Sequence, residues 1–200
     1  MTVKYSLDWK QKLKPKSNES CRACGLYLNQ PPVHQNANVA QIFWVGLSAV
    51  RFDEGAVKLP LAPSTNSGAL IQKIEEPLKN NFSIYKTNLV KCLPLNGSKI
   101  RYPSKQEMKR CYGNFKDEIA ILKPSIIFLL GKQVSSFVLS QHGIKNFSFD
   151  KNYNYSGVYL QEILYVPIHH PSYVLIYKRK QLDNYIKGLR KICEGLNIKS

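Results

Sequence analysis

Two histidines stand where an apolar run ends, within the segment LYVPIHHPSYVLIYKRK of residues 164–180. An apolar run of this kind is typical of a buried strand. His169 and His170 therefore follow the end of a strand, which can present a ring rigidly, and Pro171 fixes the chain as it leaves. A lone histidine at a strand end is more often structural than catalytic, so other residues must decide its role.

Four of the five cysteines are candidates for a metal centre. Cys21 and Cys24 form a C-x2-C pair, which can reach one metal. Cys92 follows a predicted strand, and Cys111 lies in a predicted helix. Four thiolates can hold zinc or an iron–sulfur cluster, and spacing alone does not separate the two. The plainer alternative is four unrelated buried cysteines, and Cys193 is interpreted as core packing of the last helix.

The chain is strongly basic, with 29 lysines and arginines against 13 acidic residues and a net charge of +16. This excess indicates a polyanionic partner, most often nucleic acid. A membrane surface is disfavoured, because no amphipathic anchor is evident and no apolar run approaches the roughly 20 residues of a membrane helix. The lysine-rich segment 1–20 has no apolar stretch of signal-peptide type. A cytoplasmic, reducing location is therefore expected, where disulfides are rare.

The elements that must position these side chains alternate along a chain of 200 residues, a length typical of one domain. Apolar and β-rich segments predict strands within residues 40–48, 82–92, 124–131 and 158–168. Apolar periodicity predicts helices within residues 67–81, 104–123, 132–141 and 178–196. The third strand is followed at once by a helix, and Ser104 with Glu107 forms a capping-box pattern.

Strands that are apolar on both faces favour an α/β fold with a mainly parallel sheet, covered by helices on both sides. Sites in such sheets lie beyond the carboxyl ends of the strands. Polar clusters follow three of the predicted strands, beginning at Gly46, at Thr87 with Asn88, and at His169 with His170. The three clusters are therefore expected to converge on one cleft.

The order of the motifs resembles the family 4 uracil-DNA glycosylases. The C-x2-C pair is followed by YKTNLVKCLP (85–94), a cysteine in the next helix, PSIIFLLGKQV (124–134) and HPSYVL (170–175). The resemblance covers about residues 18–193. It implies a three-layer α/β/α sandwich around a four-stranded parallel sheet, and a [4Fe-4S] cluster on Cys21, Cys24, Cys92 and Cys111, with zinc as the alternative. It also implies a DNA-repair hydrolase that excises uracil and leaves an abasic site, as in base excision repair.

The resemblance implies a role for each central polar residue. His170 matches the catalytic histidine that donates to O2 of the departing uracil, where negative charge develops. Asn88 matches the uracil-reading asparagine, whose amide can accept from N3–H and donate to O4. Cytosine has the opposite pattern at these atoms. Without the resemblance, the plainer interpretation of Asn88 is a residue that caps a turn.

DNA contacts follow from the same resemblance, because a base inside a duplex must be flipped out before it can react. Ser172 is a candidate to hold a phosphate, and Tyr173 to wedge into the base stack. Lys178 and Arg179 are expected to contact phosphates. Ser64 and Thr65 of the segment APSTNSG are candidates to supply further hydroxyls to a phosphate. The expected partner is uracil-containing DNA, single- or double-stranded, bound by a monomer.

The first motif departs from the family pattern. Leu47 stands where the family has a glutamate, and Val50 replaces a glycine. Asp53 falls near a later acidic position and is the candidate that orients the attacking water, with Glu54 as the alternative. The phenylalanine that stacks on uracil is also missing. Its place is taken by Leu61 or Pro63, or its role passes to Phe52. These changes keep a second hypothesis open, that of a non-catalytic relative which binds DNA or abasic sites.

Overall fold

The computed structural model describes residues 21–52 and 59–195 of the chain. The N-terminal segment 1–20, the candidate acid Asp53 and its alternative Glu54 lie outside the described residues. None of the helices in the described ranges is long and apolar enough to cross a membrane.

A five-stranded sheet forms the centre of the protein, in the order β2-β1-β5-β7-β6. Its strands are β1 (Ile42–Ser48), β2 (Ile84–Val90), β5 (Ile126–Leu130), β6 (Val158–Leu160) and β7 (Ile163–Ile168). The pairs β1–β2, β1–β5 and β5–β7 are parallel, which confirms the predicted core of the sheet. The side chains of β5 are all buried, as its uniformly apolar sequence predicts.

The expectation of four strands was wrong, because the segment 158–168 folds as a hairpin rather than as one strand. Strand β6 pairs antiparallel with β7 and adds an edge to the sheet. Gln161 and Glu162 make the turn, and both have positive φ angles, of 48° and 68°. Glycine or asparagine usually takes such positions. The turn therefore carries no signal in the sequence.

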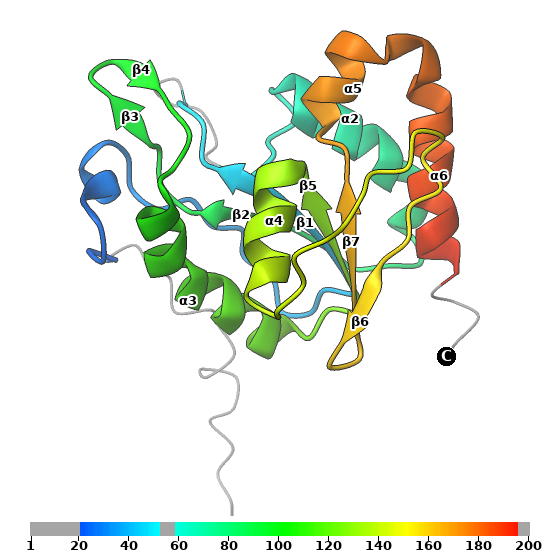
Figure 1. Cartoon of the computed structure of the whole chain (residues 1–200), viewed down its shortest axis with the longest axis horizontal. Helices are drawn as coiled ribbons and strands as arrows, with labels where there is room; N and C mark the ends of the chain where they lie inside the picture. Colours follow the sequence, from blue (N-terminus) through cyan, green and yellow to red (C-terminus); the bar gives the residue numbers. More distant parts are fainter. Residues whose placement is uncertain (1–20, 53–58, 196–200) are drawn as a thin grey trace, which may run out of the picture.

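Helices cover both faces of the sheet, so the α/β/α sandwich is confirmed (Figure 1). One face is covered by α3 (Lys105–Leu122) and α4 (Lys132–Ser140). The other is covered by α2 (Asn66–Glu75), α5 (Pro171–Tyr177) and α6 (Leu182–Glu194). Short elements complete the fold: η2 (Gly25–Leu28), η3 (Glu76–Leu78), η4 (Arg179–Gln181) and the hairpin of β3 (Leu95–Asn96) with β4 (Lys99–Ile100).

Local sequence explains how two of these helices begin. The predicted capping box of α3 is present: the Ser104 hydroxyl accepts from the Glu107 N–H, and the Glu107 carboxylate accepts from the Ser104 N–H. Helix α5 was not predicted. His170 is its N-cap and Pro171 is its first residue, a position that proline favours because its missing N–H needs no partner there. Both helices start at the edge of the sheet where the site lies.

Candidate active site

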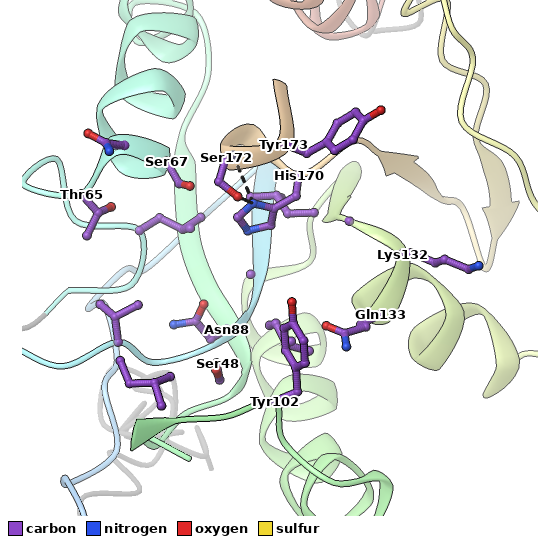
Figure 2. Close-up of a pocket in the computed structure, with 18 of the residues that line it drawn as sticks. Ser48, Thr65, Ser67, Asn88, Tyr102, Lys132, Gln133, His170, Ser172 and Tyr173 are labelled. Atoms are coloured by element: carbon purple, nitrogen blue, oxygen red, sulfur yellow. Dashed lines mark hydrogen bonds between the residues drawn. The ribbon is translucent and has the colours of Figure 1, made fainter. Parts of the chain in front are cut away.

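A cleft of 930 Å³ lies at the carboxyl edge of the parallel strands (Figure 2). It combines the ends of β1, β2, β5 and β7 with the start of α2 and with α5. The convergence of the three polar clusters is thus observed. Of the predicted site residues, these line the cleft: Phe52, Leu61, Thr65, Asn88, His170, Ser172 and Tyr173. Ser64, Lys178 and Arg179 are exposed and lie outside its lining.

The His170 ring projects into the cleft (Figure 2). Its tautomer is set by Ser172 of α5, the helix that His170 caps. The Ser172 backbone N–H donates to His170 Nδ1 at 3.2 Å, and the Ser172 hydroxyl lies 2.7 Å from the same nitrogen. A backbone N–H can only donate, so Nδ1 is an acceptor and the ring proton of the neutral form resides on Nε2. Burial lowers the pKa of His170, which favours this neutral form. The ring therefore offers an uncharged N–H donor.

Gly131, directly after β5, makes room for this ring. A Cβ at position 131 would lie 3.1 Å from the His170 Cβ, and the φ angle of Gly131 is +88°, which side chains other than glycine rarely adopt. The Gly131 N–H also donates to the Ile168 carbonyl at 2.8 Å. The ends of β5 and β7 are thereby held together beneath His170.

Asn88 forms the facing part of the cleft and is 4% exposed. It lies beside Gly46 in the register of β1 and β2. A Cβ at position 46 would collide with the Asn88 amide oxygen, so only glycine leaves the amide in place. The Asn88 backbone carbonyl accepts a 2.7 Å hydrogen bond from Lys91 Nζ. Gly46 therefore leaves room for the Asn88 side chain, and Lys91 holds its backbone carbonyl.

Lys91 belongs to a buried network that the sequence did not reveal. Its Nζ donates to Glu118 on α3 at 2.7 Å, and Lys91 and Glu118 are only 1% and 2% exposed. The Thr87 and Tyr85 hydroxyls also bond the Glu118 carboxylate. Burial opposes ionisation of Glu118, but Lys91 and the other donors hold its pKa below the usual value. The pair is a buried ion pair directly behind Asn88.

Comparison with known proteins agrees with this arrangement. Residues 14–192 match the Uracil DNA glycosylase superfamily. The chain belongs to this superfamily. A type-4 uracil-DNA glycosylase of Sulfurisphaera tokodaii is 29% identical over 182 residues, which are 86% of this chain and 80% of that protein. A type-4 uracil-DNA glycosylase of Saccharolobus solfataricus is 31% identical over 121 residues, or 58% of this chain. That match spans 53%, about half, of the Saccharolobus protein.

The fold is also shared with a solved structure. The crystal structure of SMUG2 from Pedobacter heparinus superposes with a TM-score of 0.57, over 82% of this chain and 79% of that one. The sequence identity is 14%, so this likeness concerns the fold. The chain therefore belongs to the superfamily and is similar to two of its type-4 members. Both findings confirm the resemblance that the motifs indicated.

Acidic groups are absent from the described lining of this superfamily member's cleft, which includes Leu47. Its charged lining residues within the described ranges are Arg101 and Lys132. Asp53, the predicted water-positioning acid, is not among the described residues. The described part of the cleft is therefore suited to binding anions and to donating hydrogen bonds.

The four predicted ligand cysteines lie near one another beyond the end of β2. Burial and the neighbouring thiols of Cys111, Cys24 and Cys21 raise the pKa of Cys92 to about 12. The Cys111 sulfur accepts from the Lys91 backbone N–H at 3.4 Å and from the Asn114 amide at 3.5 Å. Within residues 21–52 and 59–195, however, no three such side chains are arranged to hold a metal ion. The thiols are neighbours of suitable chemistry that do not form a ligand set here.

His169 faces away from the reaction site and does not line the cleft. Its Nδ1 lies 2.7 Å from the Tyr155 hydroxyl, and its ring stacks on Tyr173 with centroids 5.4 Å apart. The Tyr185 hydroxyl donates to its carbonyl at 2.9 Å. These contacts hold His169 in place at the start of α5.

Several lining residues were missed by sequence reasoning, among them Ser48, Ser67, Tyr102, Lys132, Gln133, Ile176 and Tyr177. Tyr102 comes from the loop after β4, which no motif marks. Lys132 and Gln133 begin α4 directly after Gly131, so the rule that sites follow strand ends would have found them.

Proposed function

We propose that the protein hydrolyses the N-glycosidic bond of uracil in DNA after the nucleotide flips out, releasing uracil and leaving an abasic site. The observation that carries the proposal is the neutral Nε2–H donor of His170, in a cleft that Asn88 also lines. This pair supplies a hydrogen-bond donor for the leaving base and a reader for its edge. Membership of the superfamily supports the assignment.

Stabilisation of the departing base is the role of His170 in this mechanism. As the N1–C1′ bond breaks, negative charge spreads onto O2 of uracil, and a fixed donor at O2 lowers the barrier. A neutral imidazole suits this task because its proton is already on the nitrogen that faces the cleft. Ser172 keeps it there, since its N–H occupies Nδ1.

Base selection is the role of Asn88. Its amide can accept from N3–H and donate to O4 of uracil, whereas cytosine reverses both groups. Discrimination requires an amide that does not rotate freely. Gly46 leaves room for the amide beside β1, and the bond from Lys91 holds the Asn88 backbone from which the amide projects.

The attacking water needs a partner that orients it towards C1′. Asp53 is the proposed residue, with Glu54 as the alternative. Phe52 and Leu61, which both line the cleft, are the proposed apolar contacts of the uracil ring. Lys178 and Arg179 are proposed to contact phosphates, as is Ser64 beside the start of α2.

A [4Fe-4S] cluster on Cys21, Cys24, Cys92 and Cys111 is the proposed cofactor, with zinc as the alternative. When bound, it would supply a structural tie between the segment with Cys21 and Cys24, the end of β2 and α3 rather than a reacting group. The influence of the Cys111, Cys24 and Cys21 thiols on the pKa of Cys92 and the two N–H···S hydrogen bonds to Cys111 support this role. A visible charge-transfer absorbance after anaerobic purification would separate the cluster from zinc.

Release of free uracil from a single-stranded, uracil-containing oligonucleotide tests the proposal. Wild-type protein should release uracil, and His170→Ala and Asn88→Ala should each lose most of that activity. His142→Ala is the matched control, because His142 is exposed and lies outside the cleft lining. Absence of release by metal-loaded wild-type protein would contradict the proposal.

A second candidate function is a non-catalytic relative that binds DNA or abasic sites. The observation that favours it is the acid-free described lining, with Leu47 in the position of the family's glutamate. In the uracil-release experiment, intact DNA binding without any free uracil would support this candidate.

A further inference from the structure

Exposed apolar side chains are concentrated around the cleft. Ten large hydrophobic residues are exposed in the described ranges, and six of these line the cleft: Val50, Ile100, Tyr102, Tyr173, Ile176 and Tyr177. A soluble protein rarely gathers exposed apolar groups at one place without a binding role. The reaction itself needs the bottom of the cleft, where His170 and Asn88 lie, and leaves this outer rim unexplained.

One side of the rim is Tyr102, whose side chain is 72% exposed and whose backbone is held by the bonds of Arg101. The neighbouring Arg101 makes a bidentate ion pair with Glu107, with bonds of 2.6 and 2.8 Å. Arg101 also donates from Nε to the Leu95 carbonyl and from Nη1 to the Tyr102 carbonyl, each at 3.0 Å. The backbone is thus fixed while the phenol ring remains free of cover, an arrangement suited to contact with a ligand.

The other side of the rim is helix α5. Tyr173 stacks on the His169 ring at an interplanar angle of 12°, and the Tyr177 ring lies 5.4 Å from that of Tyr173. Tyr177 is 70% exposed at the outer end of this aromatic row. In Figure 2, Tyr173 lies above His170 and Tyr102 lies below it. Exposed aromatic rings therefore flank the catalytic histidine on two sides.

The charge around these rings suits a polyanion. Lys132 lines the cleft, as does Arg101, whose charge is paired with Glu107, and the exposed Lys178, Arg179 and Lys180 follow α5 directly. The described lining has no acidic side chain. A basic groove with exposed aromatic rings is the arrangement by which proteins bind single-stranded nucleic acid, since each unpaired base has a free face for stacking. A duplex keeps the faces of its bases stacked on one another and offers mainly phosphates.

We propose that the cleft binds single-stranded DNA, with the bases on the two sides of the flipped nucleotide stacked on Tyr102 and on Tyr177. The proposal rests on the proposed function for the identity of the flipped base, and it adds the strand preference and the two stacking residues. A single apolar side chain would suffice to open a duplex. Two aromatic rings beside the histidine can both stack only if the bases on both sides of the flipped nucleotide are unpaired.

Equilibrium binding of a uracil-free oligonucleotide tests the proposal, measured as a single strand and as the same sequence in a duplex at equal salt. Wild-type protein should bind the single strand more tightly. Tyr102→Ala and Tyr177→Ala should each weaken single-strand binding by about 5- to 150-fold, the loss expected for one base–aromatic stack. Their binding to the duplex should change little. Tyr102→Phe should retain wild-type affinity, because it keeps the ring.

Tyr159→Ala is the matched control, since Tyr159 is 53% exposed on β6 and does not line the cleft. Equal affinity of the wild type for single strand and duplex would overturn the proposal, as would alanine variants that bind the single strand like the wild type. The assay needs no uracil release. Preference for the single strand without release of uracil would contradict only the proposed function. Release of uracil without the effects of the tyrosine substitutions would contradict only this inference.

Discussion

The two sides of the cleft are built in opposite ways. The His170 side is local: the histidine caps the helix that follows it, and its Nδ1 accepts from an N–H two residues later. The Asn88 side is assembled over long distances in the chain, since Lys91 bonds both the Asn88 carbonyl and Glu118, which lies 27 residues beyond Lys91. The proposed catalytic residue thus lies on a locally stabilised turn, and the proposed uracil-reading residue depends on the folded core.

The difference has an energetic consequence. Removal of the hydrogen bonds of His170 leaves no buried charge without its partner. Lys91 and Glu118, in contrast, are almost fully buried and depend on each other, so removal of one leaves the other unpaired in a low-dielectric interior. Changes on the Asn88 side should therefore reduce stability, whereas changes on the His170 side should reduce activity at nearly unchanged stability.

The largest expected effect is the loss of stability in Glu118→Ala. The substitution leaves the Lys91 ammonium buried without its partner, which should lower the free energy of unfolding by about 3–5 kcal/mol. Urea denaturation of the variant and the wild type measures the difference. Glu76→Ala is the control, because the Glu76–Lys79 pair is exposed and should contribute less than about 1 kcal/mol. Equal effects of the two substitutions would contradict the comparison.

The next effect is the loss of activity in His170→Ala. Removal of a single donor to a developing anion typically costs about 2.7–4 kcal/mol of transition-state stabilisation, or about 10²- to 10³-fold in rate. Folding should suffer only the loss of a helix cap, about 1 kcal/mol. Single-turnover uracil release and urea denaturation on the same preparation separate the two quantities. A stability loss as large as that of Glu118→Ala would show that the His170 side is not self-contained.

A smaller effect concerns pH. Burial lowers the pKa of His170, so the unfolded chain takes up a proton first as pH falls below about 6.5. Stability should therefore be unaffected above that pH and should decrease as pH falls below it. Uracil release should remain level from pH 7.5 to about 6.5 and decline only below the lowered pKa of the folded protein. Since burial also lowers the pKa of His169, the comparison that isolates His170 is wild type against His170→Ala.

In that comparison, the wild type should lose more stability than His170→Ala between about pH 6.5 and 5, because the variant lacks one buried neutral imidazole. Urea denaturation at several pH values measures both slopes. Identical slopes would mean that the proton uptake of His170 does not differ between the folded and unfolded chains.

The same contrast explains what could be predicted from the sequence. The parallel strands and the Ser104 capping box were predictable, because each depends on neighbouring residues. His170 and Asn88 were expected at the cleft because both lie near the carboxyl ends of strands within matched motifs, and both line it. The fifth strand was missed because Gln161 and Glu162 turn with positive φ without a glycine. The Lys91–Glu118 pair was missed because no local pattern links a lysine after β2 to a glutamate in α3.

The smallest expected effect is that of Ser172→Ala. The substitution removes the hydroxyl that lies 2.7 Å from His170 Nδ1 but keeps the backbone N–H that donates to the same nitrogen. Because Nδ1 has one lone pair, the remaining N–H should still hold the ring in its Nε2-protonated form. The loss of one neutral hydrogen bond, about 0.5–1.5 kcal/mol, should slow uracil release by no more than about 10-fold.

Single-turnover release by Ser172→Ala, beside His170→Ala, measures this difference. Ser140→Ala is the matched control, because the Ser140 hydroxyl makes a local bond to the Phe137 carbonyl outside the cleft lining. A Ser172→Ala variant as slow as His170→Ala would mean that the hydroxyl, and not the backbone, orients the ring. If the backbone N–H of residue 172 orients the ring, Ser172→Ala should stay much faster than His170→Ala, because helix α5 holds that N–H in place whatever the side chain at position 172.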